Sequence, residues 1–475
     1  MSFWKLEHPP ERLAAVDVHS GRERTYGELR ADVARAASEM ATPGKKSLIM
    51  LLAQNRYESL VAYLAALNSG DALMLVDATL NRDLLLSLIE TYRPDRICGS
   101  STSTENLPAY RERRPEDSSA SIWENENPEP AVIHPYLALL LNTSGSTGSP
   151  KLVRLSGENL QANASSIASY LQLTAEERPI TSLPMAYSYG LSVINSHLLA
   201  GAALVLSEHG VLRREFWDSM DRYGCTSFAG VPYTYQMLLQ TGLLKKRGAT
   251  LRTLTQAGGA LAEPYVRQMK DLAAERGIKF FVMYGQTEAT ARISYLPFEN
   301  LAAKAGSIGV AIPGGALRMD PETGELVYAG ANVMLGYAEC REDLSKGDEL
   351  NGILRTGDLA RQDGDGFFYV TGRLKRFLKM FGKRFNLDEV EKIVQGRFGF
   401  PTACFGRDDL LMLALEAGGE HTEAVIAMLS ETFGVPKNAV RVQAVGELPR
   451  TVRGKIDYQT LATRNQSELA ASRVS

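Results

Sequence analysis

Several short segments of the chain combine residue types that suit nucleotide chemistry. The first, NTSGSTGSPK over residues 142–151, follows an apolar run. Its small residues let backbone N–H groups converge on an anion, its hydroxyls add donors, and Lys151 adds a positive charge. The segment lacks the GxxxxGK[ST] spacing of a Walker A loop. It predicts a phosphate-binding loop, with a polar surface loop as the alternative.

The second segment, YGQTE over residues 284–288, follows the strand-like sequence KFFVM. The aromatic ring could cover a purine face, Thr287 could contact a phosphate, and Glu288 offers a hard oxygen ligand for Mg²⁺. Taken alone, the pattern is more typical of an ordinary strand-to-turn segment.

Three further segments carry charge near glycines. In LRTGDL (354–359), Asp358 could accept two hydrogen bonds from ribose hydroxyls, although a turn aspartate is the simpler interpretation. The stretch 371–391 holds many cations and a glycine, and its simplest interpretation is a basic face exposed to solvent. In LPRTVRGKIDY (448–458), Lys455 follows a glycine and would alone be a surface lysine.

The hydrophobic pattern predicts the elements that must hold these segments. Helices over 24–41 and 57–70 alternate with buried strands over 47–53 and 71–77, which is the βαβ pattern of a parallel sheet covered on both faces. The polar stretch 100–130 predicts a surface connection.

The secondary structure that the sequence predicts changes in the second half of the chain. A further α/β run extends over about 131–298, and the glycine-rich sequence from about 305 predicts a β-rich subdomain. The last hundred residues return to mixed α and β patterns. The fold class predicted is α/β, with two α/β subdomains and a small β-rich subdomain followed by a small α+β domain.

Composition narrows the classes of partner. The chain has 475 residues and a formal charge of −3, which does not favour nucleic acid or an anionic membrane. The four cysteines lie far apart without CxxC spacing, which fits a reducing compartment. The start lacks the apolar region of a signal peptide, and no apolar run has transmembrane length, so we expect a cytoplasmic protein without a membrane span.

Taken together and in order, the segments resemble the acyl-adenylate-forming superfamily, which includes acyl- and aryl-CoA synthetases, peptide-synthetase adenylation domains and firefly luciferase. The matching strings are TSGSTGSPK, AGGAL (257–261), YGQTE, RTGDL, GRLKRFLK and LPRTVRGK, with TYGEL (25–29) resembling the N-terminal helix start. One such motif is a weak hypothesis, whereas six in order cover nearly the whole chain.

The resemblance implies an acid–thiol ligase that uses ATP and Mg²⁺, forms an acyl-AMP, and passes the acyl group to CoA or to the phosphopantetheine of an acyl or peptidyl carrier protein. Lys455 would bridge ribose, the substrate carboxylate and phosphate, Thr287 would meet the α-phosphate, and Glu288 would hold the metal. The nucleotide-binding residues implied are Thr143, Ser144, Gly145, Ser146, Thr147, Gly148, Lys151, Gly258, Gly259, Ala260, Tyr284, Gly285, Gln286, Asp358 and Arg373.

The resemblance also implies two domains that move about a hinge. An N-terminal domain over 1–373 would bind the nucleotide and the acid, and a C-terminal lid over 375–475 would carry the catalytic lysine. The hinge would be Lys375, and Lys379 and Gly382 would lie along the channel for the thiol.

The sequence departs from the family pattern after Lys151 and again in the segment that contains Tyr187. Leu152 stands where the family commonly has glycine, Gly157 where it has histidine, and Tyr187 where many acyl-CoA synthetases have histidine. Tyr187, Ser188 and Tyr233 are the candidate acid-pocket residues, and the identity of the acid stays open.

Three alternatives remain at this point. Amino-acid-activating enzymes usually place an aspartate where this chain aligns Ser188, and a neutral serine disfavours a substrate ammonium. A non-catalytic nucleotide-binding protein is disfavoured because Glu288, Asp358 and Lys455 are all present. Nothing in the sequence points to a luciferase-like oxidase.

Overall fold

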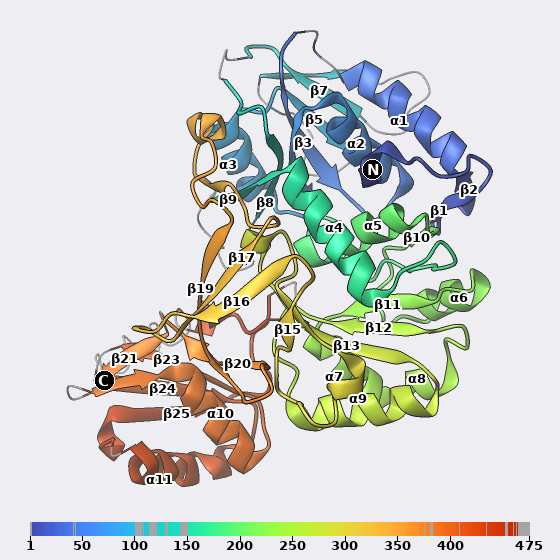
Figure 1. Ribbon diagram of the computed structural model, residues 1–475. Helices are drawn as coiled ribbons and strands as arrows, with labels where there is room; N and C mark the ends of the chain where they lie inside the picture. Colours follow the sequence, from blue (N-terminus) through green and yellow to red (C-terminus); the bar gives the residue numbers. More distant parts are fainter. Residues whose placement is uncertain are drawn as a thin grey trace. The chain divides into compact units, whose positions relative to one another are not determined.

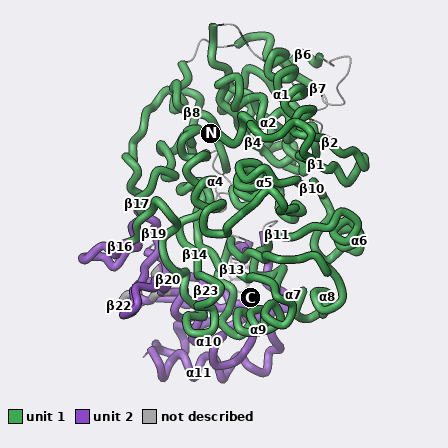
Figure 2. The backbone as a smooth tube through the Cα atoms, turned by 45° about the vertical axis from the view of Figure 1, so that its right-hand side comes forward, with its two compact units in different colours: residues 1–317, 328–354 green, residues 318–327, 355–475 purple. Residues whose placement is uncertain are grey.

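The computed structural model describes residues 2–40, 42, 44–99, 107, 109–113, 121–128, 132–142, 151–374, 376–380, 383–407, 409–433, 435–451, 455–458, 460, 461 and 463. The chain divides into two compact units, drawn in different colours in Figure 2. Unit 1 comprises residues 1–317 and 328–354, and unit 2 comprises 318–327 and 355–475. The boundary predicted at Lys375 stays a prediction, because Lys375 lies outside the described residues.

An eight-stranded sheet is the first layer of unit 1, in the order β18-β9-β8-β4-β3-β5-β7-β6. Figure 1 labels β3, β5, β7, β8 and β9 of this sheet. The parallel centre of the sheet confirms the strands predicted over 47–53 and 71–77. The strands are β3 (Leu48–Ala53), β4 (Ala72–Asp77), β5 (Arg96–Gly99), β6 (Tyr110–Arg113), β7 (Ser121–Asn125), β8 (Leu137–Asn142), β9 (Leu152–Ser156) and β18 (Gly336–Ala338).

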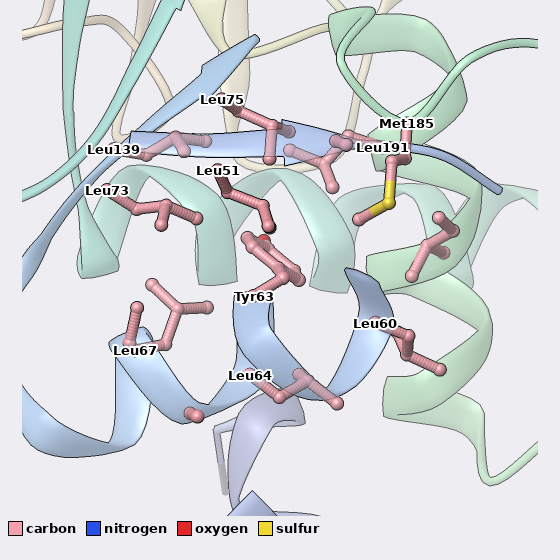
Figure 3. Packing of buried hydrophobic residues seen from close by; sticks show 14 of the residues in the cluster. Leu51, Leu60, Tyr63, Leu64, Leu67, Leu73, Leu75, Leu139, Met185 and Leu191 are labelled. Atoms are coloured by element: carbon pink, nitrogen blue, oxygen red, sulfur yellow. The ribbon is translucent and has the colours of Figure 1, made fainter. Parts of the chain in front are cut away.

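Both faces are buried at the centre of this sheet, where alternate residues of β3 and β4 point to opposite sides and both sets are buried. Leu51 of β3 and Leu73 of β4 pack with Leu64 of helix α2 (Tyr57–Ser69) in one cluster, which Figure 3 shows from close by. Met50 of β3 belongs to the opposite cluster, with Leu88 of helix α3 (Arg82–Tyr92).

The described residues within the polar stretch 100–130 include two strands that the sequence did not predict. These are β6 and β7, and β7 pairs antiparallel with β5. Ile122 and Trp123 of β7 are buried. The expectation of a surface connection alone was therefore wrong: two adjacent apolar residues were enough to attach an antiparallel strand to the sheet edge, where flanking polar side chains are tolerated.

Helix α1 (Tyr26–Met40) confirms the helix predicted over 24–41. Thr25 and Glu28 form reciprocal bonds at its start, where Thr25 Oγ1 accepts from the Glu28 N–H at 3.2 Å and Glu28 Oε2 accepts from the Thr25 N–H at 2.7 Å. This arrangement satisfies donors that a helix start leaves unpaired. A small sheet in the order β10-β1-β2 contains β1 (Leu13–Asp17) and β2 (Arg22–Thr25), which precede α1 in the chain, and the distant strand β10 (Leu204–Leu206).

The second layered part of unit 1 is a five-stranded sheet in the order β11-β12-β13-β14-β15. Its strands are β11 (Ser227–Gly230), β12 (Thr253–Gln256), β13 (Lys279–Tyr284), β14 (Ser294–Leu296) and β15 (Val310–Ala311), and its first three are parallel. The helices of this part are α4 (Gly157–Leu171), α5 (Ser188–Ala200), α6 (Arg214–Arg222), α7 (Pro232–Thr241), α8 (Leu243–Lys246) and α9 (Glu263–Glu275).

Unit 2 contains the β-rich part that the sequence predicts from about residue 305, followed by mixed α and β elements. Strands β16 (Gly315–Met319), β17 (Glu325–Gly330), β19 (Ile353–Gln362) and β20 (Phe368–Arg373) form one sheet, and the division between the units falls within β16, β17 and β19. The remaining elements are β21 (Phe377–Met380), β22 (Lys383–Asn386), α10 (Leu387–Phe398), β23 (Thr402–Arg407), β24 (Leu410–Leu415), α11 (Thr422–Phe433) and β25 (Val440–Ala444).

The C-terminal part of unit 2 has its own core. Val390 of α10, Leu413 of β24 and Leu429 of α11 belong to one buried cluster. Across the described residues of both units, no helix is long and apolar enough to cross a lipid bilayer.

Candidate active site

Two of the sequence motifs lie at one edge of the five-stranded sheet. Strands β12 and β13 are parallel neighbours, so their carboxyl ends lie at the same edge. Gly258 and Gly259 follow β12, and the YGQTE segment begins at the last residue of β13. Ligands of open α/β sheets bind outside the carboxyl ends of strands. The fold thus brings two motifs that are about 25 residues apart in sequence to the same edge of the sheet.

Gly285 is required by a close backbone approach. A Cβ atom at this position would lie 1.8 Å from the carbonyl oxygen of Ala291. The Ile293 N–H donates to the Tyr284 carbonyl at 2.9 Å across the same turn. The chain therefore folds back on itself directly after Tyr284, and this turn determines where Thr287 and Glu288 lie.

Thr287 is buried at the start of a short 3₁₀ turn, where its hydroxyl meets helix α5. Thr287 Oγ1 lies 3.2 Å from Ser188 Oγ, and both residues are less than 8% exposed. Ser188 is the first residue of α5 and follows Tyr187. The structure therefore joins a predicted phosphate contact to a predicted acid-pocket residue, although they are about 100 positions apart in sequence.

Glu288 is held by a residue that sequence reasoning missed. The hydroxyl of Tyr337, on β18, donates to Glu288 Oε1 at 2.9 Å. Burial and the neighbouring Glu288 carboxylate raise the pKa of Tyr337, so the phenol remains a donor at neutral pH. Lys151 Nζ lies 3.7 Å from the centre of the Tyr337 ring and 3.8 Å from Glu339 Oε1. Tyr337 thus links the candidate metal ligand to the lysine of the predicted phosphate loop.

The sequence holds only a faint signal for Tyr337. The string VMLGY places an aromatic after an apolar run, which also describes an ordinary strand end. What brings Tyr337 to the site is the antiparallel pairing of β18 with β9, in which Tyr337 lies opposite Val153. That pairing joins segments about 180 residues apart.

The predicted phosphate loop connects β8 to β9. Thr143, Ser144, Gly145, Ser146, Thr147 and Gly148 lie outside the described residues, whereas Lys151 directly precedes β9. Their role in binding phosphate remains a prediction.

The candidate acid-pocket tyrosines have different surroundings. Tyr187 is buried, and its ring lies edge-on to that of Tyr189 at a centroid distance of 6.2 Å. Gly258 has a φ of +84°, and a Cβ atom there would lie 2.6 Å from the Tyr187 hydroxyl. Tyr233, near the start of α7, is 36% exposed. Tyr187 therefore lies against the glycines after β12, and Tyr233 opens to solvent.

In unit 2, the two residues predicted to bind ribose are adjacent. Asp358 on β19 and Arg373 on β20 are register partners, and Arg373 Nε donates to Asp358 Oδ1 at 3.2 Å. The Asp358 side chain is buried and that of Arg373 is exposed. An acidic oxygen beside a fixed cation can receive hydroxyl donors from a sugar.

Lys455 is half-buried in unit 2, where the Thr451 N–H donates to its carbonyl at 2.7 Å. Lys379 lies on β21, and Lys375 and Gly382 are outside the described residues. Glu288 and Thr287 belong to unit 1, and Asp358, Arg373 and Lys455 belong to unit 2.

The donor chemistry around Glu288 suits a magnesium ion held mainly by a substrate. No cluster of three or more His, Cys, Asp or Glu side chains that could hold a metal occurs in the described part of the chain. Mg²⁺ is commonly bound by one or two carboxylates together with substrate phosphates. Glu288, fixed by Tyr337, matches that arrangement.

Comparison with known proteins gives a consistent result. A family model described as AMP-binding enzyme matches residues 3–338. A sulfoacetate–CoA ligase of Cupriavidus necator is 28% identical over 67% of this chain and 65% of that protein. An oxalate–CoA ligase of Arabidopsis thaliana is 27% identical over 95% of each, and a feruloyl-CoA synthase of Amycolatopsis is 27% identical over 92% of this chain and 93% of that protein.

The fold has solved counterparts. The ATP-bound structure of MatB from Rhodopseudomonas palustris matches with a TM-score of 0.77 and 23% identity, over 97% of this chain and 98% of that one. Its similarity extends over both compact units, so the fold class expected from the sequence is confirmed.

Proposed function

The chain belongs to the family of AMP-binding enzymes, and we propose that it activates a carboxylic acid as an acyl-AMP and transfers the acyl group to the thiol of CoA. In the first step, the acid's carboxylate oxygen attacks the α-phosphorus of ATP, and the bond to the β-phosphate oxygen breaks. Pyrophosphate leaves. In the second step, the thiol sulfur attacks the acyl carbon, and AMP leaves with the electron pair of the broken C–O bond.

The first step concentrates negative charge at the α-phosphate, so catalysis depends on donors and cations held there in advance. Thr287 offers a hydroxyl fixed by Ser188. Lys455 would offer an ammonium from unit 2, and Asp358 with Arg373 would orient the ribose. Mg²⁺, bound at Glu288 with the phosphates, would neutralise charge on the phosphate oxygens.

The buried contact between Ser188 and Thr287 is the observation that carries the choice of substrate class. An α-amino acid would bring an ammonium to this position, and the residue there is a neutral hydroxyl. A desolvated ammonium without a carboxylate partner costs several kcal/mol. We therefore propose an acid that has no ammonium next to its carboxylate.

The choice of CoA as acceptor rests on the relatives, whose names describe CoA ligases and synthases. A phosphopantetheinylated carrier protein presents the same thiol and is the alternative acceptor. The named acids differ in kind, since sulfoacetate and oxalate carry a second acidic group and ferulate does not.

A panel of acids tests the proposal. Pyrophosphate release should be measured with ATP, Mg²⁺ and short aliphatic, dicarboxylic, hydroxy, aromatic and α-amino acids, followed by thioester formation with CoA and with a carrier protein. We expect at least one acid without an α-ammonium to drive pyrophosphate release and to form an acyl-CoA. Release driven by α-amino acids alone would overturn the substrate class, and the absence of release with every acid would overturn the activity.

A further inference from the structure

A small, mainly apolar cavity lies beside the candidate active site, wholly within unit 1. Its walls come from helices α4 and α5 and from β11, β12 and β13, and the few polar residues that line it include Ser192, His197, Ser227, Thr255 and Arg292. The cavity measures about 20 Å³ for the centres of water-sized molecules, and a single water needs roughly 10–15 Å³. A space of this size suits a group of a few atoms better than an aromatic ring.

Arg292 supplies the positive charge of this cavity. Its side chain is 2% exposed, and its Nε has no hydrogen-bond partner. Among the described residues, the only side-chain hydrogen bond of its guanidinium is with Tyr170, and no ion pair joins Arg292 to a carboxylate. The guanidinium lies over the ring of Tyr189, 3.9 Å from the ring centre. A cation–π contact compensates only in part for the cost of burying an ion that has no partner of opposite charge.

The other groups in the cavity carry no charge that balances Arg292. Burial lowers the pKa of His197 to about 4, so its ring is neutral at physiological pH. Its Nδ1 lies 2.8 Å from the Val193 carbonyl, which fixes the proton on Nδ1 and leaves Nε2 as an acceptor without a partner. The hydroxyl of Ser227 is also buried without a partner and can donate.

Helix α5 connects the cavity to the reaction centre. Ser188, at the start of α5, touches Thr287, and Ser192 lies one turn further along the same helix. One turn corresponds to about 6 Å of helix axis. At about 1.2 Å per bond of extended chain, this distance corresponds to an acid of a few carbons. An acid whose carboxylate reacts near Thr287 would thus extend its far end towards Arg292.

We propose that the acid carries a second anionic group, a carboxylate or sulfonate, which binds to Arg292 inside this cavity with Ser227 as an additional donor. The inference rests on the proposed function and names its substrate class. The second anion would supply the negatively charged partner that the buried guanidinium lacks, and the neutral His197 would accept a hydrogen bond from Ser227 or from a water molecule.

The test compares diacids with acids that differ only in the charge of the far end. Succinate, glutarate and adipate should each be measured against their monoamides, as kcat/KM for acid-dependent pyrophosphate release. A charge-assisted hydrogen bond contributes about 1.5–3 kcal/mol, so the native enzyme should prefer the best diacid over its monoamide on the order of 10- to 100-fold. The difference should appear mainly in KM, because the second anion binds away from the reacting atoms.

Substitution of Arg292 separates recognition from folding. In Arg292→Met the ratio of diacid to monoamide should fall to about 1, and in Arg292→Lys it should stay well above 1 because the charge remains. Arg178→Met is the matched control, because Arg178 is a partly buried arginine whose guanidinium donates to the Tyr223 carbonyl, away from the cavity. This variant should keep the native ratio.

The outcomes distinguish the two proposals. A native enzyme that turns over monoamides as well as diacids, or an Arg292→Met variant with the native ratio, would overturn the role of Arg292 and leave the ligase activity standing. If Arg292→Met does not fold, protection of the native enzyme against thermal unfolding by a diacid but not by its monoamide supports the proposal, and equal protection overturns it. Failure of every acid to release pyrophosphate would overturn the activity itself.

Discussion

Ser188 Oγ lies 3.2 Å from Thr287 Oγ1, and this contact joins the start of helix α5 to the turn that follows β13. The pair is buried and uncharged, so a substituent at Ser188 acts directly on the group expected to meet the α-phosphate.

Replacing Ser188 by aspartate should place a carboxylate beside Thr287, where it would repel both the α-phosphate and the incoming acid. We expect Ser188→Asp to lower kcat/KM for acid-dependent pyrophosphate release by at least about tenfold, the effect of about 1.4 kcal/mol. Ser188→Ala removes only the hydroxyl and should have a smaller effect. Native activity in Ser188→Asp would show that this contact lies away from the reacting groups.

Tyr337→Phe tests whether the phenol positions Glu288 for a metal. Losing the 2.9 Å bond leaves the carboxylate free to rotate, and loss of a residue that orients a metal ligand costs about 10- to 100-fold in metal affinity or activity. We expect the Mg²⁺ concentration for half-maximal rate to rise about tenfold. The control is Tyr92→Phe, because Tyr92 donates to the Ala338 carbonyl of the same strand. An equal rise in both variants would indicate a general disturbance of β18.

Lys455→Ala tests the division of labour between the two steps. Removing a cation from a developing charge costs about 10²–10³ in rate, so we expect adenylation to fall by that factor. Thiolysis of a supplied acyl-adenylate should continue at nearly the native rate. Pyrophosphate exchange near the native level would remove Lys455 from the adenylation step.

Lys375→Pro tests the predicted hinge. Proline holds φ near about −65° and should restrict the backbone to one arrangement of the two domains. We expect adenylation to persist while thioester formation falls, each measured separately with CoA and with a carrier protein. Native rates for both steps would exclude domain alternation about this residue, and the proposed place of Gly382 in the thiol channel would lose its basis.

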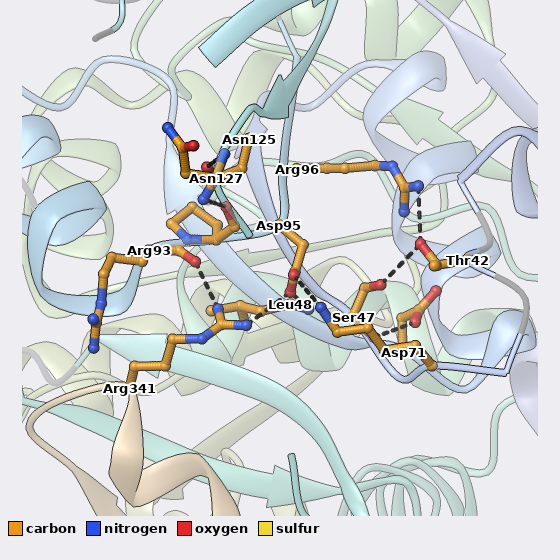
Figure 4. A network of polar contacts seen from close by, with 12 residues as sticks. Thr42, Ser47, Leu48, Asp71, Arg93, Asp95, Arg96, Asn125, Asn127 and Arg341 are labelled. Carbon is orange, nitrogen blue, oxygen red and sulfur yellow. Dashed lines mark hydrogen bonds and ion pairs between the residues drawn. The ribbon is translucent and has the colours of Figure 1, made fainter. Parts of the chain in front are cut away.

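Asp95→Asn tests a buried ion pair that stabilises unit 1 (Figure 4). Asp95 accepts from the Leu48 N–H at 2.8 Å, from Lys45 Nζ at 2.9 Å and from Arg341 at 2.9 Å, and the Arg341 side chain is fully buried. Loss of one partner of such a pair costs about 3–5 kcal/mol, which urea unfolding should measure. Asp271→Asn, on an exposed pair with Lys270, should cost less than about 1 kcal/mol.

The pH dependence of the same pair has a definite sign. Burial alone would raise the pKa of Asp95, but the bonds from Leu48, Lys45 and Arg341 outweigh it and hold the pKa below its usual value. The carboxylate therefore stabilises the folded state above the unfolded pKa of about 3.9, and this contribution is lost as the pH falls further. In Asp95→Asn the free energy of unfolding should fall less steeply with decreasing pH below about pH 4. The same pH dependence as in the native protein would contradict the stabilising role of the Asp95 carboxylate.

Local patterns predicted the elements better than the contacts between them. The βαβ start was readable because the apolar runs of β3 and β4 are continuous and end at turn residues. Six ordered motifs led to the prediction that Thr287, Glu288, Asp358 and Lys455 act in the site. The strand β7 was missed because only Ile122 and Trp123 mark it within a polar stretch.

Pairings between distant segments were beyond the sequence for a physical reason. Neither the sequence around Tyr337 nor that around Val153 indicates that the two residues pair. In the sequence Arg292 looks like an ordinary surface arginine, and only the fold shows that it is buried over Tyr189. Ser188 was expected in the acid pocket from an alignment, but its contact with Thr287 depends on how α5 packs.

The position of β18 has a consequence for synthesis on the ribosome. Strand β9 ends at Ser156, and the strand that covers its outer edge begins only at Gly336. At about 5–20 residues per second, translation takes roughly 10–40 s to span that interval. During this time β9 is an uncovered sheet edge, a template for pairing with other chains. A nascent chain stalled before residue 336 would thus be more prone to aggregate than one stalled shortly after β18 has left the exit tunnel.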